Sequence, residues 1–488
     1  MQDTEAAETM HVETSTMEWR GRHTVILGAA RQGTALARWL ARHGALVTLS
    51  DLRSESELAG ARAALSDLPI EWVLGAHPPA LLDDCDVLFL SGGVPNDVPI
   101  VQEAHRRGIH FSNDAQLFLE RAPCPTVGIT GSAGKTTTTA LLGAMAKAAW
   151  GDVAGAGSER RVYVGGNIGD PLISYADAIQ AGDLAVMELS SFQLEYTTLS
   201  PAVAVVLNIT PNHLDRHVSM REYTEAKQRI LRFQSPRDTA ILNRDDPGSW
   251  GLRDGCKGRM LAFSLRPLDQ DQDGAFVQDG ILHLRSHGAT FPLLPRARLR
   301  LAGEHNVSNA LAAFAAGEAA GIPLDAMLVG AAEFQGVAHR LEFVRDVRGV
   351  RWYNDSIATA PERTMAALRS FDQPIVLLLG GRDKNLPWDE LAALVRQRVD
   401  HVVVFGEAAP KILKALGIAG NSVAKASKPA AQPTTVRRCE TLEQAVLAAA
   451  EVAAPGDVVL LSPGGTSFDA FKDFEERGER FRQCVQAL

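Results

Sequence analysis

The chain has 488 residues, of which 46% are hydrophobic and 22% charged, and this is the composition of an ordinary globular protein. It excludes a mostly disordered, collagen-like or coiled-coil chain, and the length predicts about three domains. Acidic residues number 58 and basic residues 49, so the formal net charge is −9. Dedicated binders of nucleic acid or anionic membranes usually carry a basic excess, so we expect no nucleic-acid partner and no membrane insertion.

The cysteines and the N-terminus favour a cytoplasmic protein. The five cysteines lie far apart and form no Cys-x-x-Cys pair, which argues against a disulfide framework or a zinc knuckle. Residues 1–21 are acidic and lack the apolar core of a secretory signal, so we expect a disordered tail there. No run of about 18 apolar residues appears, so no transmembrane helix is expected.

Three blocks of apolar strands alternating with helical stretches follow the tail, and this pattern predicts α/β domains with parallel sheets. We place the blocks at residues 22–121, 122–336 and 337–488. The expected strands are 23–28, 45–50 and 86–91 in the first block, 126–130, 184–189 and 202–208 in the second, and 350–354, 375–379, 402–405 and 458–461 in the third. The expected helices are 32–42, one that begins at Lys135, and 305–320, whereas the Lys-, Ala- and Pro-rich segment 425–435 is expected to form a loop.

The strongest local signal is segment 128–137, in which a strand leads through a glycine-rich turn into a helix. Backbone N–H groups in such a turn wrap phosphate oxygens, and the helix dipole favours the negative charge. Lys135 would place its charge on the β- and γ-phosphates, and the Thr136 hydroxyl would ligate Mg²⁺. The strict phosphate-loop pattern has glycine where this chain has Ile129, but Gly134-Lys135-Thr136 after a strand still predicts nucleotide binding.

A weaker glycine turn runs from Gly28 to Gly33, at the position of a dinucleotide-binding fingerprint. Asp51 follows about 20 residues further on, as that fingerprint requires. The middle glycine is replaced by Ala30, so the support for NAD is weak. A tight turn without a ligand fits equally well, and so does a site for another pyrophosphate-bearing ligand.

Nine short motifs follow one another through all three blocks. They are 131–137 (GSAGKTT), 166–169 (GNIG), 188–195 (ELSSFQLE), 208–215 (NITPNHLD), 223–227 (YTEAK), 305–309 (HNVSN), 339–342 (HRLE), 354–356 (NDS) and 462–469 (SPGGTSFD). This ordered set resembles the Mur ligase family, and within it the glutamate-adding branch. The resemblance covers about residues 20 to 488.

The resemblance implies an α/β protein of three domains: a Rossmann-like UDP-binding domain, a central ATPase domain of the phosphate-loop type with a mainly parallel sheet, and a Rossmann-like C-terminal domain. It implies that ATP phosphorylates the alanine carboxylate of UDP-N-acetylmuramoyl-L-alanine. The amino group of D-glutamate then attacks the acyl phosphate, leaving an amide, ADP and phosphate. The expected setting is peptidoglycan precursor synthesis in the cytoplasm, by a monomer.

By resemblance, the catalytic residues are Lys135, Glu188, His213 and Lys227. Thr136 and Glu188 are expected to ligate the first of two Mg²⁺ ions and His213 the second, since cations must bring an anionic phosphate to an anionic carboxylate. Lys227 is expected to become a metal ligand after CO₂ converts its amine into an anionic carbamate. Without the resemblance, Lys227 would be interpreted as a solvated helix lysine.

The resemblance also assigns two sets of binding residues. ATP is expected on Gly131, Ser132, Ala133, Gly134, Lys135, Thr136, Thr137, Asn306, Asn309, Arg340 and Asp355. The UDP-sugar is expected on Ala30, Arg31, Gln32, Asp51, Arg53, Gly92, Gly93, Asn167 and Ser190. Asn306 and Asn309 are three residues apart, hence on one helix face. A surface ion pair with Glu342 is the alternative for Arg340, and structural roles are the alternative for His217 and His339.

Glutamate is expected, by the same resemblance, on Lys384, Ser467, Phe468 and Phe474. Most glutamate-adding members carry a lysine where this chain has Ile357, and that lysine holds a carboxylate of the incoming amino acid. Arg382 and Arg363 are the candidates to replace it. A related branch that adds L-glutamate for later epimerisation also lacks this lysine, so L-glutamate stays an alternative substrate.

Other protein classes explain fewer of these features. Folylpolyglutamate synthase shares the ATP domain but not a UDP-binding first block. An NAD-dependent oxidoreductase leaves the Lys135 loop unexplained, and a non-catalytic nucleotide-binding regulator does not need Glu188, His213 and Lys227 together. The Asp-Asn-Pro-Arg pattern of ligases that add other amino acids is absent from the sequence.

Overall fold

The computed structural model describes residues 19–151, 160–167, 169–211, 216–217, 219–301, 303–384, 386–418 and 435–488. Their contacts form two compact units. The first contains the described residues up to Leu299 together with Glu304–Phe334, and the second contains Arg300–Gly303 and Gln335–Leu488. Within the described ranges, every helix is too short or too polar to cross a bilayer.

The first unit begins with a five-stranded parallel sheet. Its strands β1 (His23–Leu27), β2 (Leu46–Asp51), β3 (Ile70–Leu74), β4 (Val87–Leu90) and β5 (His110–Ser112) lie in the order β3-β2-β1-β4-β5. The helices of this part are α2 (Arg31–Arg42), α3 (Ala59–Ala64), the 3₁₀ turn η1 (Pro79–Leu82), α4 (Pro99–Arg107) and α5 (Asp114–Arg121). Parallel strands end at one edge of a sheet, so the turns after β1, β2 and β4 meet there.

Trp19 corrects the predicted extent of the N-terminal tail. Its side chain is only 4% exposed and packs against Trp39 and Phe89, with ring centroids 6.4 and 5.8 Å away. An indole buries a large apolar area, so the first sheet retains this residue. Trp19, which lies within the segment 1–21 that was expected to be disordered, is therefore part of the folded core.

The larger part of the first unit is a nine-stranded sheet of order β14-β13-β12-β11-β10-β9-β6-β8-β7. Its strands are β6 (Thr126–Thr130), β7 (Val162–Gly166), β8 (Leu184–Glu188), β9 (Val203–Val206), β10 (Thr239–Asn243), β11 (Arg259–Ser264), β12 (Gly274–Gln278), β13 (Ile281–Ser286) and β14 (Ala289–Pro295). Pairing is parallel from β7 through β12 and antiparallel for β13 and β14. The helices are α6 (Lys135–Trp150), η2 (Leu172–Tyr175), α7 (Ser191–Leu194), α8 (Met220–Arg232), α9 (Pro247–Trp250), η3 (Arg253–Gly255), η4 (Arg296–Arg298), α10 (Glu304–Ala319) and α11 (Leu324–Glu333).

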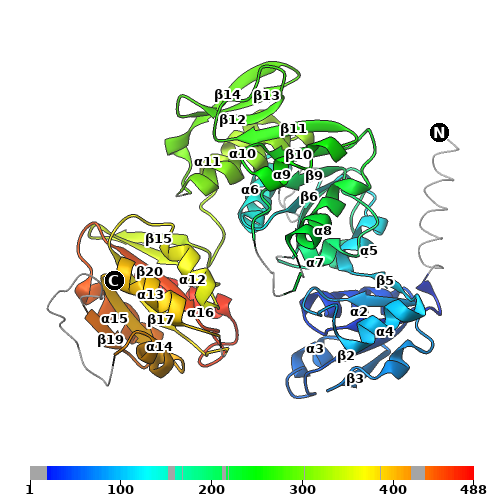
Figure 1. Cartoon of the computed structure of the whole chain (residues 1–488), viewed down its shortest axis with the longest axis horizontal. Helices are drawn as coiled ribbons and strands as arrows, with labels where there is room; N and C mark the ends of the chain where they lie inside the picture. The colour runs from blue at the N-terminus through cyan, green and yellow to red at the C-terminus, as the bar shows by residue number, and fades with distance from the viewer. Residues whose placement is uncertain are drawn as a thin grey trace. The chain divides into compact units, whose positions relative to one another are not determined.

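Alternating residues of β9 show how this sheet is covered. Val203 and Val205 join the apolar cluster under α6, α10 and α11, which lie side by side on one face (Figure 1). Ala204 and Val206 join the cluster on the other face, which also contains Tyr223 of α8. That second cluster also contains residues that pack on the first sheet, for example Phe118 of α5. The two sheets therefore belong to one compact unit, and the predicted boundary at residue 122 lies between them.

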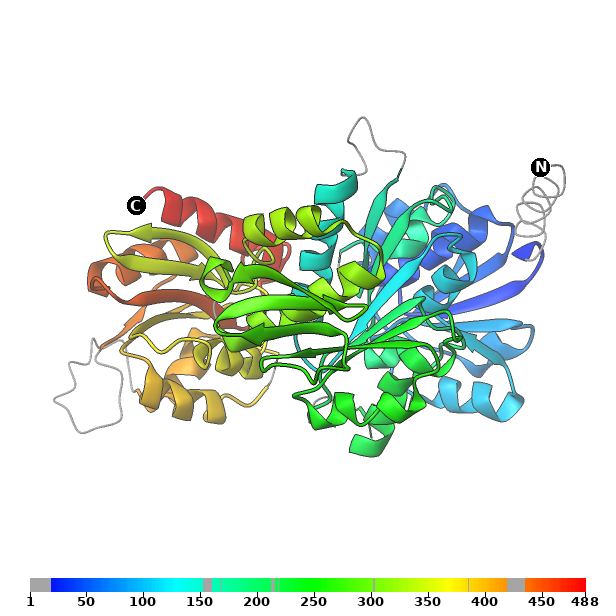
Figure 2. The same ribbon diagram turned by 90° about the horizontal axis from the view of Figure 1, so that it is seen from above.

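The second unit is built on a six-stranded sheet of order β15-β16-β20-β17-β18-β19, in which only β15 is antiparallel to its neighbour. The strands are β15 (Glu342–Val347), β16 (Val350–Asn354), β17 (Ile375–Gly380), β18 (His401–Phe405), β19 (Thr435–Arg438) and β20 (Val458–Gly464). Helices α12 (Pro361–Leu368), α13 (Asp389–Arg398) and α14 (Ala409–Ala415) pack on one face, and α15 (Leu442–Val452) and α16 (Phe474–Gln486) on the other. Figure 2 shows α16, at the red end of the chain, on the opposite face of this sheet from the gold helices.

The predicted α/β class with mainly parallel sheets is confirmed, and each predicted block contains one sheet. The exact block boundaries stay a prediction. The predicted loop 425–435 is wrong at its last residue, because Thr435 begins β19, where its hydroxyl contacts the His401 ring at 2.7 Å. The rest of that loop lies outside the described residues.

Candidate active site

The phosphate loop joins the end of β6 to the start of α6, as predicted. Gly134 adopts a left-handed backbone with φ of 85°, which favours glycine. Asn208, just after β9, holds the loop from the side: its Oδ1 accepts from Ala133 N at 2.8 Å and its Nδ2 donates to Ala133 O at 3.1 Å. The Asn208 carbonyl also accepts from Ser132 N at 2.9 Å, so the loop is fixed before any ligand binds.

Helix α10 contacts this loop through the predicted asparagine face. A Cβ atom at Gly134 would lie 2.3 Å from Asn309 Oδ1, so only glycine permits this approach. Asn309 Nδ2 donates to Asn306 Oδ1 at 3.1 Å, which confirms that the two side chains share one face. The structure therefore brings together the ATP-binding residues predicted for the first unit.

Two lysines converge on one carbonyl of the loop. Lys135 Nζ and Lys227 Nζ donate to Gly131 O at 2.9 and 3.0 Å. Lys227 is 1% exposed, and its ammonium group lies 4.6 Å from the centre of the Tyr223 ring. Burial, followed by the charge of Lys135, lowers the pKa of Lys227 well below the ordinary lysine value, against the opposing effect of Glu188. Lys227 is thus a buried residue of α8 that contacts the loop, and not a solvated helix lysine.

Glu188 stands at the end of β8 beside Asn167. Gly166 has φ of 101°, and a Cβ there would lie 2.6 Å from Glu188 O, so glycine allows the two segments to meet. Asn167 Nδ2 donates to Glu188 Oε1 at 2.7 Å, whereas Glu188 Oε2 is buried and accepts no hydrogen bond in the described part of the chain. A buried carboxylate oxygen without a donor suits a Mg²⁺ ligand.

The rest of the predicted metal site is incomplete in the described residues. The Thr136 side chain, 7% exposed, lies in the first turn of α6. His213 lies outside the described residues. Within the ranges that the structure covers, no group of three or more His, Cys, Asp and Glu side chains is arranged to hold a metal ion. Glu188 and Thr136 therefore fit a metal ion that takes most of its other ligands from phosphate and water.

Tyr223 supports the phosphate loop, and sequence reasoning gave it no role. Its hydroxyl donates to Ser132 Oγ at 3.0 Å, and Ser132 Oγ donates to Thr210 O at 2.9 Å. Tyr223 precedes Lys227 by one turn of α8, so the helix supplies both a support for the loop and its buried amine. The signal was present in the segment 223–227, which includes both residues.

The first glycine turn has a different structure. A Cβ at Gly33 would lie 1.8 Å from Gly28 O, so this glycine allows α2 to pack against β1. Asp51 Oδ2 accepts from Ala29 N at 2.7 Å, and its two oxygens also accept from Arg53 Nη2 and Nε at 2.8 and 3.0 Å. Burial alone would raise the pKa of Asp51, but the hydrogen bonds from Arg53 and from Ala29 together lower it. Asp51 orients Arg53, whose side chain is 44% exposed, at the edge where β1, β2 and β4 end.

The other predicted UDP-sugar residues lie at the same edge. Ala30 and Arg31 are exposed beside the start of α2, and Gln32 Oε1 lies 3.6 Å from a Cβ built on Gly92. Sequence reasoning missed Arg216, which donates to Gly93 O at 3.3 Å and to Val94 O at 3.0 Å. Arg216 follows the 208–215 motif directly, and through it the large sheet contacts the loop after β4.

The turn after β8 is also linked to the first sheet. Ser190 caps α7 in a capping box with Gln193, whose Nε2 donates to the two Asp114 oxygens at 3.2 and 3.3 Å. Burial raises the pKa of Asp114 to about 6. His217 packs in the same turn, with Nε2 2.9 Å from Ser191 Oγ, which supports its structural interpretation.

In the second unit, β16, β20 and β17 are neighbours and end at one edge. Asp355 follows β16, Lys384 follows β17 and Ser467 follows β20, so the three predicted residues are brought to this edge. Burial raises the pKa of Asp355 to about 7. The Ser462 hydroxyl donates a hydrogen bond to Asp355 at 2.8 Å, and this bond opposes the increase. Phe474 is the first residue of α16, and its carbonyl accepts from Ser356 Oγ at 2.8 Å.

The cations that could replace the lysine missing at Ile357 differ in their surroundings. Arg382 forms two hydrogen bonds to Glu407, at 2.8 and 3.0 Å, so its guanidinium is occupied. The pKa of Lys384 is lowered by burial and by the charge of Arg363. Of the two expected replacements for the missing lysine, Arg363 is therefore the better supported. Phe468 is 59% exposed.

Three family models match the chain: the Mur ligase MurD-like N-terminal domain at residues 22–112, the Mur ligase middle domain at 129–317, and the Mur ligase glutamate ligase domain at 339–465. Two curated relatives carry the name UDP-N-acetylmuramoylalanine--D-glutamate ligase. The protein from Symbiobacterium thermophilum is 43% identical over 466 residues, which is 95% of this chain and 97% of the relative. The protein from Geobacter metallireducens is 41% identical over 476 residues, which is 97% of this chain and 99% of the relative.

Solved structures show the same fold at low identity. MurF from Acinetobacter baumannii matches with a TM-score of 0.55 and 18% identity, covering 94% of this chain and 93% of that chain. UDP-N-acetylmuramate-alanine ligase MurC from Thermotoga maritima matches with a TM-score of 0.54 and 19% identity, covering 96% of this chain and 99% of that chain. The family models and the relatives, which extend over nearly the whole sequence, establish that this chain belongs to the Mur ligase family.

Proposed function

We propose that this chain is an ATP-dependent ligase that joins D-glutamate to the alanine carboxyl group of UDP-N-acetylmuramoyl-L-alanine in peptidoglycan precursor synthesis. The observation that carries the proposal is a phosphate loop contacted by two lysines and adjoined by a buried glutamate, in a chain 43% identical to a ligase with that name. The enzyme works in the cytoplasm as a monomer.

The first step activates a carboxylate. A carboxylate is a poor acyl donor because its oxygen is a poor leaving group. An oxygen of the alanine carboxylate attacks the γ-phosphorus of ATP, the bond to the β-phosphate oxygen breaks, and ADP leaves. Lys135 neutralises charge on the β- and γ-phosphates, while backbone N–H groups of the loop from Gly131 to Thr137 bind their oxygens. Asn306 and Asn309 hold the loop and the nucleotide from α10, and Arg340 and Asp355 bind ATP from the C-terminal part.

Mg²⁺ would supply positive charge that neutralises the phosphates, so that an anionic carboxylate could approach the γ-phosphorus. Glu188 Oε2 and the Thr136 hydroxyl would hold the first ion and His213 the second. The buried Lys227 amine, with its lowered pKa, is readily available as the free base that reacts with CO₂. Carbamylation, with loss of one proton, would turn this amine into an anion that could serve as a metal ligand beside Glu188.

The second step forms the amide. The amino group of glutamate attacks the acyl carbon, the bond from that carbon to the phosphate-bearing oxygen breaks, and phosphate leaves. Lys384 and Arg363 would hold the carboxylates of the amino acid, and Ser467, Phe468 and Phe474 would line its site. Arg363 would thus take over the role of the lysine that most glutamate-adding members have at the position of Ile357.

The UDP-sugar lies along the turns after β1, β2 and β4. Ala30, Arg31, Gln32, Gly92 and Gly93 would supply backbone and side-chain donors to the pyrophosphate. Arg53, oriented by Asp51, would face the uridine, and Asn167 and Ser190 would contact the muramoyl end. Asn167 would thus join the substrate to Glu188, to which it already donates at 2.7 Å.

A coupled assay of ADP formation tests this proposal. UDP-N-acetylmuramoyl-L-alanine, ATP and Mg²⁺ are supplied in every reaction, with D-glutamate in one, L-glutamate in a second and no amino acid in a third. We expect ADP formation with D-glutamate alone. Turnover with L-glutamate alone would show that L-glutamate is the substrate and that Ile357 distinguishes the ligases that use it. No ADP formation in any reaction would reject the proposed activity.

A further inference from the structure

Arg340 sits in an unusual turn of the second unit. Its two neighbours, His339 and Leu341, have φ of 62° and 44°, in the left-handed region that residues with a side chain avoid. Arg340 N donates to Val337 O at 3.1 Å across the turn. Two such residues around one arginine persist only where surrounding contacts enforce the conformation.

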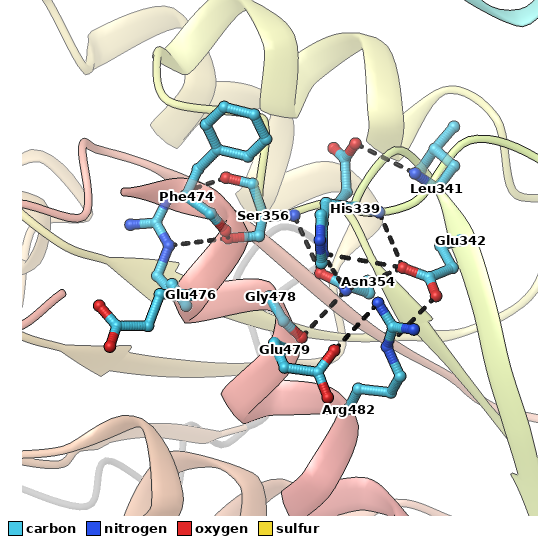
Figure 3. A network of polar contacts seen from close by, with 12 residues as sticks. His339, Leu341, Glu342, Asn354, Ser356, Phe474, Glu476, Gly478, Glu479 and Arg482 are labelled. Carbon is cyan, nitrogen blue, oxygen red and sulfur yellow. Dashed lines mark hydrogen bonds and ion pairs between the residues drawn. The ribbon is translucent and has the colours of Figure 1, made fainter. Parts of the chain in front are cut away.

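Glu342, the first residue of β15, supplies the central contact. Its Oε2 accepts from His339 N at 2.7 Å and from Asn354 Nδ2 at 3.0 Å (Figure 3). Its Oε1 lies 3.5 Å from Arg482 Nε of α16. The carboxylate, 15% exposed, thus ties the strained turn to β16 and to α16, and hydrogen bonds to a charged acceptor are stronger than neutral ones.

The same contacts fix the His339 ring. Asn354 is fully buried, and its Nδ2 lies 3.0 Å from His339 Nδ1 and 3.1 Å from Gly478 O. A Cβ at Gly478 would lie 2.1 Å from His339 Nδ1, so the ring lies directly on the α16 backbone. His339 O in turn accepts from Ile357 N at 3.1 Å.

Leu341, on the other side of Arg340, is tied to Asp355. Its N–H donates to Asp355 Oδ1 at 3.2 Å, and Asp355 N donates to Leu461 O at 2.7 Å. Both neighbours of Arg340 are therefore anchored through their N–H groups, one by Glu342 and the other by a residue proposed to bind ATP. The backbone on each side of the arginine is therefore held by hydrogen bonds.

We propose that Glu342 is a positioning residue, which holds the left-handed turn so that the Arg340 guanidinium is presented to the ATP phosphates. This inference rests on the proposed function, because it takes ATP as the ligand of Arg340. It replaces the alternative in which Glu342 serves Arg340 as a surface ion-pair partner.

The test is a double-mutant cycle of Glu342→Gln and Arg340→Lys, read in the ADP assay. Glutamine keeps the size of the side chain but removes the charge that accepts from His339 N and Asn354. We expect Glu342→Gln to raise the KM for ATP about tenfold while the KM for the UDP-sugar changes less than about twofold. In the Arg340→Lys background the same change should raise the KM for ATP less than about threefold, because the residue being positioned is already lost.

Glu479→Gln is the matched control. Glu479 Oε2 contacts Arg482 Nη2 at 3.3 Å but does not touch the turn, so this variant should match the wild type. Should Glu342→Gln not fold, as judged by thermal unfolding, Arg482→Met takes its place in the cycle. It removes the ion pairs of Arg482 to Glu342 and to Glu479, and Glu479→Gln controls for the second. We expect a rise in the KM for ATP of about threefold, with the same loss of effect beside Arg340→Lys.

The cycle is repeated by calorimetry with a non-hydrolysable ATP analogue and Mg²⁺, which needs no turnover. A wild-type Kd for Glu342→Gln would overturn the inference, and so would an equal effect of this change in both backgrounds. Absence of turnover in the wild type with an intact binding cycle would instead reject the proposed reaction and leave the role of Glu342 standing.

Discussion

Two strand-to-helix turns in the first unit have similar glycine patterns and different structures. In the turn from Gly28 to Gly33, the backbone N–H of Ala29 is already bound by Asp51, and Gly33 serves the packing of α2 on β1. In the turn from Gly131 to Gly134, Asn208 fixes the loop from outside, and two lysines gather on one carbonyl.

The difference teaches that glycines in such turns report close packing, whereas the chemistry is set by charged groups that other elements bring to the turn. The first turn has a carboxylate that orients an arginine, which suits binding of a pyrophosphate or a nucleoside. The second has two amines and, close by, the buried Glu188, which suits transfer of a phosphoryl group. Substitutions in the two turns should therefore affect different quantities.

The largest effect is expected for Lys135→Ala. It removes the charge proposed to stabilise the transferred phosphoryl group, so kcat should fall by about 10²- to 10³-fold. Steady-state ADP formation measures this change. Lys257→Ala is the control, since Lys257 also donates to a backbone carbonyl, Arg232 O at 2.9 Å, but on the exposed surface. An activity of Lys135→Ala equal to that of the control would contradict the proposed role.

Lys227→Ala should reduce turnover by about 10²-fold, because it removes a proposed metal ligand. If that ligand is a carbamate, acetate or bicarbonate added to the variant should restore part of the activity by supplying carboxylate oxygens in the vacated space. Mass spectrometry of the wild type in ¹³CO₂-labelled buffer, with chemical trapping, reports the modification directly. Full activity of the unrescued variant would exclude the carbamate.

In the first turn, Gly33→Ala should act on stability and substrate binding. The added methyl would lie 1.8 Å from Gly28 O, so α2 must move from β1, at a cost of about 1–3 kcal/mol. Urea unfolding and the KM for the UDP-sugar both report this movement. Gly60→Ala, in α3, is the control: nothing lies within 4 Å of its Cβ, and alanine should stabilise that helix by up to about 1 kcal/mol. Equal stability of the two variants would refute the packing role of Gly33.

The smallest effect is expected for Asp51→Asn. It weakens the hold on Arg53, so the KM for the UDP-sugar should rise by about two- to fivefold. Because the folded-state pKa of Asp51 is depressed, its contribution to stability is present above pH 4 and is lost as the pH falls further. The variant should therefore lose less stability than the wild type on acidification below about pH 4. Parallel curves of melting temperature against pH would contradict this assignment.

Much of the fold was predictable because strand and helix periods are local properties. Strands β6 and β16 have the predicted bounds, and α10 begins one residue before its predicted start. The strands β12 to β14, which are joined by antiparallel pairing, were missed, since their short, partly exposed segments carry little apolar signal. The burial of Trp19 was also missed, because it depends on Trp39 and Phe89, which are distant in the sequence.

The residues of the site could be predicted where they belong to a short sequence motif. Contacts between residues of different motifs could not be predicted in this way. The sequence placed Lys135, Glu188 and Lys227 in one site only through resemblance, and their convergence follows from the β8-β6-β9 order of the sheet. The roles of Tyr223 and Arg216 arise from hydrogen bonds to segments about 90 or more residues away, which no local pattern encodes.

The central claim is that ATP activates the alanine carboxylate as an acyl phosphate. The most direct measurement uses UDP-N-acetylmuramoyl-L-alanine with both carboxylate oxygens replaced by ¹⁸O, followed by mass analysis of the phosphate released with D-glutamate and ATP. We predict one ¹⁸O atom per phosphate, because the oxygen that attacks the γ-phosphorus leaves with it when the amide forms. Phosphate without ¹⁸O, at an equal yield of the amide, would contradict the acyl phosphate.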